Sequence, residues 1–425
     1  MIIREEGRPV LAMIESNTTG TGRTFAVAAR ARGLRPVLLT CKPERYPWVA
    51  EDDVDVVLTD TTDDAAVADV ARASAAEARL AGLVTSSEYF VAVTARAAAR
   101  LGLPGADPGA VERCRDKRRQ RAALASSGVA VPAHFPAATP EEAVTAAQAI
   151  GFPVVVKPAD GTGSRGVRLC CDDAEVRDHT AALLARRHDE RGQPTIPAVL
   201  VEEYVAAPEV SVETFGTTVV GVTTKHLGHL PSFVECGHDF PADATSVAGV
   251  GTLAVAALEA LGLGFGPAHT EIRLGGRKPV VIEVNPRLAG GRIPTLVRLA
   301  TGIDLVSATV DAVTGEAEPL PEPGPGHAAV RFLVPPLPGR VRRTDGVAAA
   351  AAVPGVVDVA IAARPGQRVG GTGSFLDRVG HVIAAGPTAG AARTAAEAAL
   401  ALLIVDVEAN DMADAALPST AKVLA

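Results

Sequence analysis

Residues 268–287 read Ala268-His-Thr-Glu271-Ile-Arg-Leu-Gly-Gly-Arg-Lys-Pro-Val-Val-Ile-Glu283-Val-Asn285-Pro-Arg287. Two short runs of alternating apolar and polar residues flank a Gly-Gly-Arg-Lys turn, which predicts a β-hairpin. The register stays open from the sequence. If a bulge pairs the strands so that Glu271 faces Glu283, two carboxylates and the Asn285 amide oxygen converge, and this set suits Mg²⁺. The alternative is an ordinary surface hairpin whose acids are solvated.

The overall composition narrows the class of protein. The chain has 425 residues, and because one hydrophobic core stops growing near about 250–300 residues, we expect two to four domains. A formal net charge of −8 at pH 7 argues against nucleic acid as the main partner. Acidic residues stand in Met1–Gly7, where a signal peptide has its apolar core, and no uncharged apolar run reaches membrane-spanning length. We therefore expect a cytoplasmic protein without a membrane segment.

The cysteines indicate a reducing environment. They are five in number and show no Cys-x-x-Cys spacing, which favours neither a disulfide framework nor a zinc site. We predict free thiols at Cys41, Cys114, Cys170, Cys171 and Cys236.

Short apolar runs alternate with helical runs from Val10 to about Pro108. This alternation predicts a parallel sheet with flanking helices, and we assign residues 1–108 to an N-terminal α/β domain. The strands are expected at Val10–Ile14, Pro36–Leu39, Val54–Leu58 and Leu83–Thr85, and the helices at Thr24–Arg32, Ala65–Ala81 and Tyr89–Leu101.

Two strand-to-helix turns of this domain carry polar residues. The turn Glu15–Arg23 could hold an anion on exposed N–H groups, but it matches no Walker A or Gly-x-Gly-x-x-Gly motif, so a tight connection is favoured. Ser86 and Ser87 are interpreted as N-caps and Glu88 as a favourable first-turn charge. A substrate role for the second turn stays open, because open α/β sheets bind ligands at the carboxyl ends of their strands.

A lysine and a glycine-rich loop follow further along. The basic segment Val111–Arg121 predicts a helix whose charges would, taken alone, form a solvated face. Gly151–Lys157 then predicts an apolar strand that ends in a lysine, and Asp160–Gly166 adds three glycines. Glycine backbone can close N–H groups around phosphate oxygens, and Lys157 supplies a fixed positive charge beside them. These two features predict a phosphate site.

A strand, a short break and a second strand are expected between Ala198 and Glu213. Acidic residues at such a break are not required for packing. The peptide groups of Glu202–Val205 could read an adenine edge, and Glu209 could accept the ribose hydroxyls. The segment thus predicts the nucleoside end of the same site.

Taken in order, these motifs resemble the ATP-grasp superfamily of carboxylate–amine and carboxylate–thiol ligases over roughly residues 10–400. The matching elements are an Asp-Lys before a helix, Val-Val-Lys-Pro with its glycine-rich loop, Val-Glu-Glu-Tyr-Val followed by Pro-Glu, and Glu271 with Glu283-Val-Asn-Pro-Arg287. The resemblance implies a multidomain fold of α/β and α+β type. A two-part ATP-grasp domain is expected at residues 109–318, with lobes of about 132–205 and 206–318.

The resemblance also implies the site residues. It implies an ATP site on Lys117, Lys157, Gly161, Gly163, Ser164, Gly166, Glu202, Glu203, Tyr204, Val205 and Glu209. It implies Mg²⁺, with Mn²⁺ as the alternative, on Glu271, Glu283 and Asn285, and it makes Arg287 and Lys157 the cations at the transferred phosphoryl group. One departure is that Arg118 and Arg119 follow Lys117, which leaves open which cation points inward.

Within the superfamily the chain is most similar to the L-amino-acid (dipeptide) ligases, through Pro231–Pro241, Gly266–Glu271 and Arg287–Pro294. In that branch these positions line the substrate pockets, which implies substrate contacts for Glu235, His238, His269, Gly290, Gly291 and Arg292. Structural alternatives stay open. Glu235 and His238 could hold a loop through a mutual hydrogen bond, His269 could support a metal ligand, and the two glycines could form a helix-entry turn.

The Pro/Gly-rich linker Pro319–Gly326 precedes a small C-terminal accessory domain, expected at residues 327–408. Gly370–Ser374 invites a phosphate interpretation, but no metal motif accompanies it, so a turn is predicted. His226 and His229 are interpreted as surface-loop histidines. Strands are expected at Ala328–Val334, Val356–Ala362 and Val382–Ala385, a helix at Ala389–Val405, and fraying from Ala409 onward.

The activity that the resemblance implies is carboxylate–amine ligation. ATP activates a small, amino-acid-like carboxylate as an acyl phosphate, an amine attacks it, and ADP and phosphate are released. The resemblance is compatible with a homodimer. Two alternatives stay open: another ATP-grasp reaction, with a thiol acceptor or in nucleotide biosynthesis, and a non-catalytic ATP-binding regulatory module. The complete set of metal ligands argues against the module.

Overall fold

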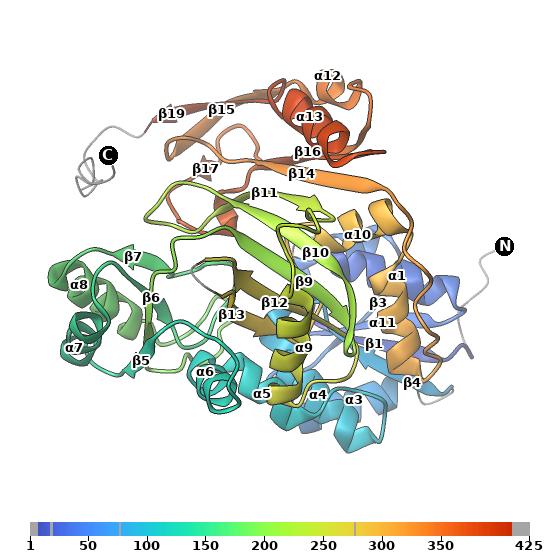
Figure 1. The fold of residues 1–425 in the computed structure, drawn as a ribbon. Helices are drawn as coiled ribbons and strands as arrows, with labels where there is room; N and C mark the ends of the chain where they lie inside the picture. Colours follow the sequence, from blue (N-terminus) through green and yellow to red (C-terminus); the bar gives the residue numbers. More distant parts are fainter. Residues whose placement is uncertain (1–6, 18–19, 76–77, 276–277, 410–425) are drawn as a thin grey trace.

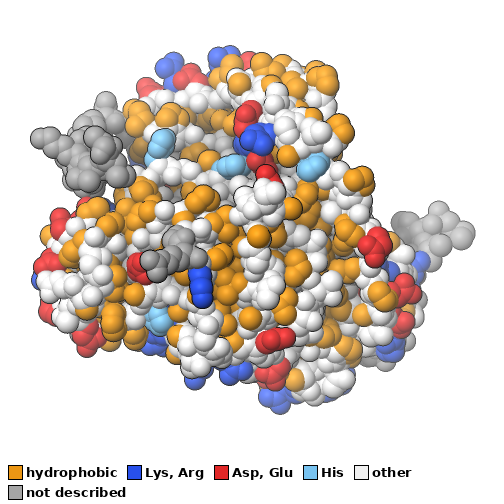
Figure 2. Space-filling view, viewed as in Figure 1, with side chains coloured by type: hydrophobic (Ala, Val, Ile, Leu, Met, Phe, Trp, Pro, Cys, Tyr) orange, Lys and Arg blue, Asp and Glu red, His pale blue; other side chains and the backbone are white. Residues whose placement is uncertain are grey.

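The computed structural model of the protein describes residues 7–17, 20–75, 78–275 and 278–409. Within these ranges no helix combines the length and the apolar character needed to cross a bilayer. Figure 1 shows the chain passing from an N-terminal unit through two groups of strands to a C-terminal part that extends the large sheet. On the face drawn in Figure 2, acidic and basic side chains are interspersed. The domain boundaries expected at 108, 318 and 327 stay a prediction.

The N-terminal unit is a parallel four-stranded sheet in the order β3-β2-β1-β4, which confirms the predicted sheet. Its elements are β1 (Val10–Ile14), α1 (Thr21–Ala31), β2 (Arg35–Thr40), η1 (Pro43–Arg45), α2 (Trp48–Glu51), β3 (Asp55–Leu58), α3 (Asp64–Ser74), β4 (Leu80–Val84), η2 (Glu88–Phe90) and α4 (Val91–Leu101). The predicted helix Ala65–Ala81 is wrong in length, because α3 ends at Ser74. Alanines continue past that end, and alanine favours helix on both sides of it.

Both faces of this sheet are buried, as parallel sheets require. Val10, Ala12 and Ile14 pack with α3 and α4. Leu11 and Met13 point the other way and pack with α1 and with α11 (Leu305–Thr314). β1 and β4 are neighbours although β2 and β3 lie between them in sequence, so the strand order reverses there. In such sheets ligands bind beside the carboxyl ends at the reversal.

Two helices, α5 (Pro108–Arg115) and α6 (Lys117–Ser126), replace the single basic helix predicted over Val111–Arg121. Asp116 leaves the helical conformation and its carboxylate accepts the N–H of Arg118, so it caps α6. The break places Lys117 against the next lobe, where its N–H donates to the Ala159 carbonyl at 2.8 Å.

The first lobe is an antiparallel sheet in the order β5-β8-β6-β7, covered by two helices. Its elements are β5 (His134–Ala137), α7 (Pro140–Ile150), β6 (Val154–Pro158), β7 (Arg168–Cys170), α8 (Asp173–Leu184) and β8 (Val199–Glu203). Val154 and Val156 of β6 pack under α7 and α8, and the buried strand carries Lys157 outward from this core.

The largest sheet has eight strands in the order β13-β12-β9-β10-β11-β14-β18-β16, with antiparallel pairing between its described strands. Its first part comprises β9 (Glu209–Phe215), β10 (Thr218–Leu227), β11 (Glu235–Phe240), α9 (Val250–Leu261), β12 (Pro267–Arg273), β13 (Val280–Asn285), α10 (Ile293–Thr301) and α11. Val210, Val212 and Ile272 pack with α9 on one face. Alternation then leaves the polar residues of these strands on the opposite face.

The C-terminal part of the chain continues this sheet with three of its strands, β14, β18 and β16. Its elements are β14 (His327–Leu333), β15 (Gly339–Asp345), α12 (Val347–Ala351), β16 (Val356–Ile361), β17 (Arg368–Val369), η3 (Phe375–Asp377), β18 (Gly380–Gly386), α13 (Ala389–Leu400) and β19 (Ile404–Ala409). The three predicted strands are confirmed, and β14 pairs with β11. The predicted helix to Val405 is wrong, because α13 ends at Leu400 and a strand follows. Residues 410–425, expected to fray, lie outside the described residues.

Candidate active site

A cavity of about 260 Å³ lies between the carboxyl ends of β1 and β4, the polar face of the large sheet and the glycine-rich loop Asp160–Gly166. All predicted site residues except Gly166 and Arg292 line it. Gly166 turns toward α8, where its carbonyl contacts His179 at 2.9 Å. Arg292 precedes α10 with a left-handed φ of 66° and lies near Gly20. These two residues therefore lie outside the cavity lining, unlike the other predicted site residues.

The floor of the cavity is the predicted hairpin of β12 and β13. Glu271 lies directly opposite Glu283, and a bulge shifts the register at the next position, where Ile272 pairs with Val281. The extra residue of the bulge, Ile282, also lines the cavity. Cross-strand partners share a face, so both carboxylates point into the cavity. The tip of the hairpin, Gly276 and Arg277, lies outside the described residues.

A hydrogen-bond chain orients Asn285. His269, which faces Asn285 across the strands, contacts the Arg287 carbonyl through Nδ1 at 3.1 Å and the Asn285 amide nitrogen through Nε2 at 3.3 Å. A carbonyl only accepts, so Nδ1 carries the proton, Nε2 accepts, and the amide oxygen of Asn285 is left for another partner. Burial, together with Arg287, lowers the pKa of His269 to about 4, so the ring stays neutral. His269 thus fixes the orientation of the Asn285 amide.

Two buried lysines neutralise the facing carboxylates. Lys225 Nζ lies 2.8 Å from Glu271, and Lys117 Nζ lies 3.1 Å from Glu283. Burial and the neighbouring acids raise the pKa of Glu271 to about 7 in spite of Lys225. Burial alone would raise the pKa of Glu283 as well, but Lys117 and Lys157 outweigh it and hold that pKa below its usual value. Lys117 is therefore the inward-pointing cation, whereas Arg118 pairs with Asp116.

Lys157 belongs to a buried charge cluster. Its ammonium group contacts Glu202, and the same carboxylate accepts the guanidinium of Arg121 at 2.5 Å. Arg121 is 1% exposed, so this member of the basic segment is not on a solvated face. The sequence assigned Glu202 to the adenine hinge, but its carboxylate is the counter-ion of Lys157. Its two cations hold the pKa of Glu202 at about 2 although burial opposes this.

Tyr204 and its neighbours form the end of the cavity at which the sequence predicts the nucleoside. The Tyr204 ring lies 6.2 Å from that of Phe233, and the guanidinium of Arg273 stands over both rings. Arg273 also donates to Glu209 at 2.9 Å and to the Val205 carbonyl at 3.2 Å. An aromatic surface beside exposed peptide groups and a fixed carboxylate suits a nucleoside. Arg273 and Phe233 were not predicted.

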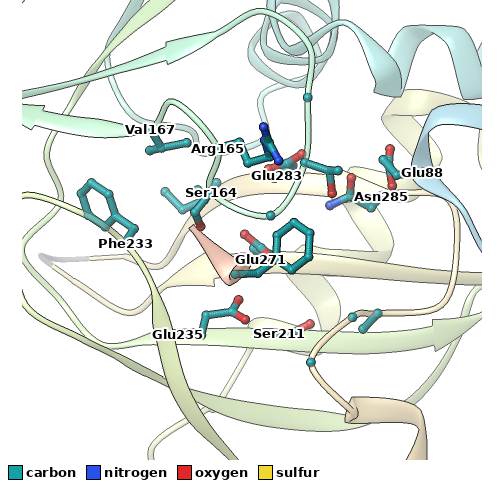
Figure 3. A pocket seen from close by; sticks show the side chains of 18 of the residues that line it. Glu88, Ser164, Arg165, Val167, Ser211, Phe233, Glu235, Glu271, Glu283 and Asn285 are labelled. Atoms are coloured by element: carbon teal, nitrogen blue, oxygen red, sulfur yellow. The ribbon is translucent and has the colours of Figure 1, made fainter. Parts of the chain in front are cut away.

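The glycine-rich loop covers the opposite side of the cavity. Gly161, Gly163 and Ser164 have positive φ values of 108°, 65° and 60°. The Gly161 carbonyl accepts from Lys117 Nζ at 2.9 Å, which ties the loop to the floor. Figure 3 shows Ser164 and Arg165 of the loop across the pocket from Glu235 and Glu271.

Glu88 connects the N-terminal unit to Arg287. Its carboxylate contacts the Arg287 guanidinium and, at 2.7 Å, that of Arg115. These cations lower the pKa of Glu88 to about 2 against the effect of burial. Glu88 stands in the first turn of η2 and Ser87 precedes it at the N-cap position, as predicted, but the Ser87 side chain makes no capping bond. Ser86 Oγ instead accepts from the Asn17 N–H.

Glu235 and His238 lie at the far end of the cavity. The Glu235 carboxylate contacts Lys225 at 2.9 Å and Arg378, and these cations hold its pKa well below the usual value in spite of burial. His238 Nε2 lies 3.3 Å from the Glu235 carboxylate, but neither ring nitrogen of His238 has a hydrogen-bond partner, so the predicted mutual hydrogen bond is not formed. Burial lowers the pKa of His238 to about 3.

The two glycines before α10 allow this arrangement. Gly290 and Gly291 line the cavity, and the N–H of Ile293 donates to Gly290, so they form the predicted helix-entry turn. A Cβ at Gly291 would lie 2.4 Å from His238 Cε1, so any residue other than glycine would overlap the His238 ring. His226 is not in a surface loop as expected, since it lies in β10 and contacts Asp239 at 2.9 Å.

The cysteines are free, as predicted, and none lines the cavity. Among the described residues no three His, Cys, Asp or Glu side chains converge as a metal cluster. The two carboxylates of the hairpin, with the Asn285 amide, are a smaller oxygen set. Mg²⁺ commonly binds such a set and completes its coordination with water and phosphate.

Three segments of the chain match known domain families. Residues 26–105 match the ATP-grasp N-terminal domain, residues 150–295 the ATP-grasp domain, and residues 331–408 the L-amino acid ligase C-terminal domain 2. Uncharacterized protein y4rH of Sinorhizobium fredii is 39% identical over 390 residues, which cover 91% of this chain and 80% of that protein.

Characterised ligases are more distant relatives. Alanine–anticapsin ligase of Bacillus subtilis is 28% identical over 269 residues, covering 56% of this chain and 55% of that protein. Dapdiamide A synthase of Enterobacter agglomerans is 29% identical over 208 residues, covering 45% and 48%. These matches span about half the length of each ligase.

Solved structures share the fold. The L-amino acid ligase from Bacillus licheniformis superposes with a TM-score of 0.78 at 22% identity, covering 95% of this chain and 99% of that one. Biotin carboxylase from Campylobacter jejuni superposes with a TM-score of 0.68 at 17% identity, covering 95% and 93%. Together with the ordered domain matches and the likeness to y4rH over most of both chains, the fold shows that this chain belongs to the ATP-grasp ligase family.

Proposed function

We propose that the protein is an ATP-dependent carboxylate–amine ligase that joins small, amino-acid-like substrates through an acyl phosphate and releases ADP and phosphate. One observation carries the proposal. Glu271 and Glu283 face each other on the cavity floor, with the Asn285 amide oxygen beside them and Lys117 against Glu283. Binding of a nucleoside triphosphate requires this combination of metal ligands and fixed cations around the phosphates.

The hairpin residues fit a magnesium ion. Glu271, Glu283 and the Asn285 amide oxygen are hard ligands of the kind that Mg²⁺ prefers, with Mn²⁺ as the alternative. Burial raises the pKa of Glu271 to about 7, and a divalent cation would favour its ionised form. When bound, the metal would neutralise charge on the β- and γ-phosphate oxygens.

The remaining cavity residues accommodate the nucleotide. The peptide groups of Glu203–Val205 would face the adenine edge, and Glu209 would accept the ribose hydroxyls. Lys117 and Lys157 would contact the phosphates, with Glu202 and Arg121 holding Lys157 in place. Gly161, Gly163 and Ser164 would supply loop N–H groups above the phosphates.

The chemistry proposed is transfer of the γ-phosphoryl group to a substrate carboxylate. The carboxylate oxygen attacks the γ-phosphorus in line, the bond to ADP breaks, and Arg287 and Lys157 stabilise the charge on the transferring group. A neutral amine then attacks the acyl carbon, phosphate leaves with the bonding electrons, and the proton that the nitrogen loses goes to the departing phosphate. Positioning and electrostatics account for both steps, and no nucleophilic side chain of the protein is required.

The end of the cavity at Glu235 suits the amine substrate. The Glu235 carboxylate is ionised, and its depressed pKa keeps it so over the working range of pH. Its oxygens would accept a hydrogen bond from the ammonium group of an amino acid in addition to those from Lys225 and Arg378. His238 stays neutral beside it, and Gly291 packs so closely against the ring that no side chain would fit between them.

The test is ADP and phosphate release with Mg²⁺-ATP across a panel of amino-acid pairs, with product identification by mass spectrometry. Hydroxylamine added to the reaction should trap the acyl phosphate as a hydroxamate. Glu283→Gln should abolish release, whereas Glu259→Gln on the exposed side of α9 should not.

The substrate panel also separates the alternative reactions. Release that depends on a thiol or on a nucleotide-precursor amine would replace the amino-acid assignment with another ATP-grasp reaction. If ATP binds but no acceptor gives turnover, the remaining alternative is a non-catalytic ATP-binding regulatory module. We also propose that the protein is a homodimer, and its molar mass from light scattering tests this.

A further inference from the structure

The C-terminal part of the chain reaches the cavity through one turn, Gly370–Arg378, between β17 and β18; we name it the C-terminal turn. Two of its side chains, Phe375 and Arg378, line the cavity together with the nucleotide and metal candidates. The sequence suggested only an ordinary turn there.

The C-terminal turn is held rigidly from inside. The buried carboxylate of Asp377 accepts from the N–H of Thr372 at 3.0 Å, from its hydroxyl at 2.8 Å, and from the N–H of Gly373 at 2.8 Å. Ser374 is 1% exposed and its hydroxyl contacts that of Thr372 at 2.8 Å. A turn fixed by its own hydrogen bonds presents its outer side chains in one orientation.

Phe375 meets the glycine-rich loop at its centre. The N–H of Phe375 donates to the Gly163 carbonyl at 3.3 Å, and its ring lies so close that a Cβ at Gly163 would be 2.4 Å from Cδ1. On the other side the loop is held by Lys117, at the Gly161 carbonyl, and by Arg287, at the Thr162 hydroxyl. Phe375 is therefore the contact that holds the loop from the C-terminal part of the chain.

Arg378 meets Glu235 at the substrate end. Its Nε donates to the Glu235 carbonyl at 3.0 Å and its terminal nitrogen contacts the Glu235 carboxylate. The guanidinium lies 4.3 Å from the centre of the Phe332 ring, which fixes its plane. Arg378 thus restrains both the backbone and the carboxylate of Glu235.

Simple packing between parts of the chain does not account for this arrangement. Leu376 lies between the two cavity residues, yet it is 49% exposed, whereas Phe375 and Arg378 face the cavity. The two side chains that face inward each contact a residue of the cavity lining, Gly163 or Glu235.

We propose that the C-terminal turn completes the active site as a positioning element. Phe375 holds the glycine-rich loop over the nucleotide phosphates, and Arg378 holds Glu235 toward the amine substrate. The second statement rests on the proposed function, whereas the first requires only that a nucleotide binds.

The test of Phe375 uses Phe375→Ala and the milder Phe375→Leu in the full chain, with Leu376→Ala as the matched control. Amide hydrogen exchange is followed in peptides covering Asp160–Gly166, with and without Mg²⁺ and the non-hydrolysable analogue AMPPNP. Loss of the ring contact should raise loop exchange and weaken AMPPNP binding by about tenfold, the scale of one buried aromatic contact. Leu376→Ala should change neither quantity.

The outcomes are separable. Should Phe375→Ala misfold, Phe375→Leu gives the same comparison. Unchanged loop exchange and AMPPNP affinity in a folded Phe375 variant would overturn the role of Phe375. Raised exchange in a protein that turns over no substrate pair would uphold that role and reject the ligase assignment.

The test of Arg378 compares the KM for the amine substrate with the KM for ATP. Arg378→Gln should raise the KM for the amine substrate by about tenfold and leave that for ATP within twofold, because Arg378 contacts Glu235 and not the nucleotide residues. Arg378→Lys keeps the charge and should restore part of the effect, and Arg364→Gln at an exposed position should have none. Equal changes in both KM values would overturn the role of Arg378.

Discussion

Glu271 and Glu283 lie directly opposite each other on β12 and β13, each against a different buried lysine. Two carboxylates on one buried face repel unless cations lie between them. Lys117 and Lys225 stand beside the two carboxylates and offset this repulsion. The two acids thus occupy facing positions in the sheet, but Glu271 pairs with Lys225 and Glu283 pairs with Lys117.

Glu271→Gln should lower the maximal rate of ADP release by about 10²- to 10³-fold, the scale of losing one group that stabilises transition-state charge. The Mg²⁺ concentration for half-maximal activity should rise as well, since one charged ligand is lost. Rates measured across a Mg²⁺ titration check this. A variant with the wild-type Mg²⁺ dependence would remove Glu271 from the metal site.

His269→Phe should weaken the apparent affinity for Mg²⁺ by about 10- to 100-fold, the usual cost of losing a group that orients a ligand. Without the ring nitrogen, nothing from His269 fixes the Asn285 amide, and its oxygen no longer has one orientation. The comparison is His229→Phe, at an exposed position after β10. Equal Mg²⁺ dependence in both variants would show that Asn285 is oriented by something else.

Glu202→Gln should destabilise the protein by about 3–5 kcal/mol, because Lys157 and Arg121 would be left buried without their shared counter-ion. The adjacent Glu203→Gln is the control, since Glu203 is exposed and should change stability by less than about 1 kcal/mol. Urea denaturation at pH 7 gives both values. A small effect at Glu202 would mean that water or another acid replaces it.

His238→Phe should reduce the acid sensitivity of the fold. The folded pKa of His238 is about 3, below its ordinary value of 6.5, because the ring is buried. Between these values the unfolded chain binds more protons, so the stabilising contribution is complete above pH 6.5 and is lost as the pH falls toward 3. In this range the wild type should lose up to about 1.4 kcal/mol per pH unit more than the variant.

The free energy of unfolding at pH 7, 6 and 5 tests this prediction. His229→Phe should keep the wild-type slope because His229 is exposed. Parallel curves for wild type and His238→Phe would show that the ring binds protons equally in the folded and the unfolded chain.

Features set by local sequence could be predicted. The hairpin, the glycine-rich loop and the strand that carries Lys157 follow from alternation and from glycine placement within about 20 residues each. Their common site followed from the order of the motifs and from the family resemblance. Lys117 was predicted in the same way, and the helix break at Asp116 explains why it, and not Arg118, points inward.

Features set by contacts between distant segments could not be predicted. The register of Glu271 depends on the bulge at Ile282, which no residue type marks. Glu88 lies 199 residues from Arg287, and a short polar turn gives no sign of that partner. Lys225 reads as one polar position of a strand, although it contacts three carboxylates.

The pairing of β11 with β14 decides where the chain can be divided. The Pro/Gly-rich segment Pro319–Gly326 has the composition of a linker at which the chain could be truncated. A chain ended there would lose β14, β16 and β18, and the N–H and carbonyl groups of β11 would stand open along a new sheet edge. Open edges recruit strands from other molecules. Expression of the ATP-grasp part alone should therefore yield aggregates, and the C-terminal part is needed to keep the nucleotide-binding part monodisperse.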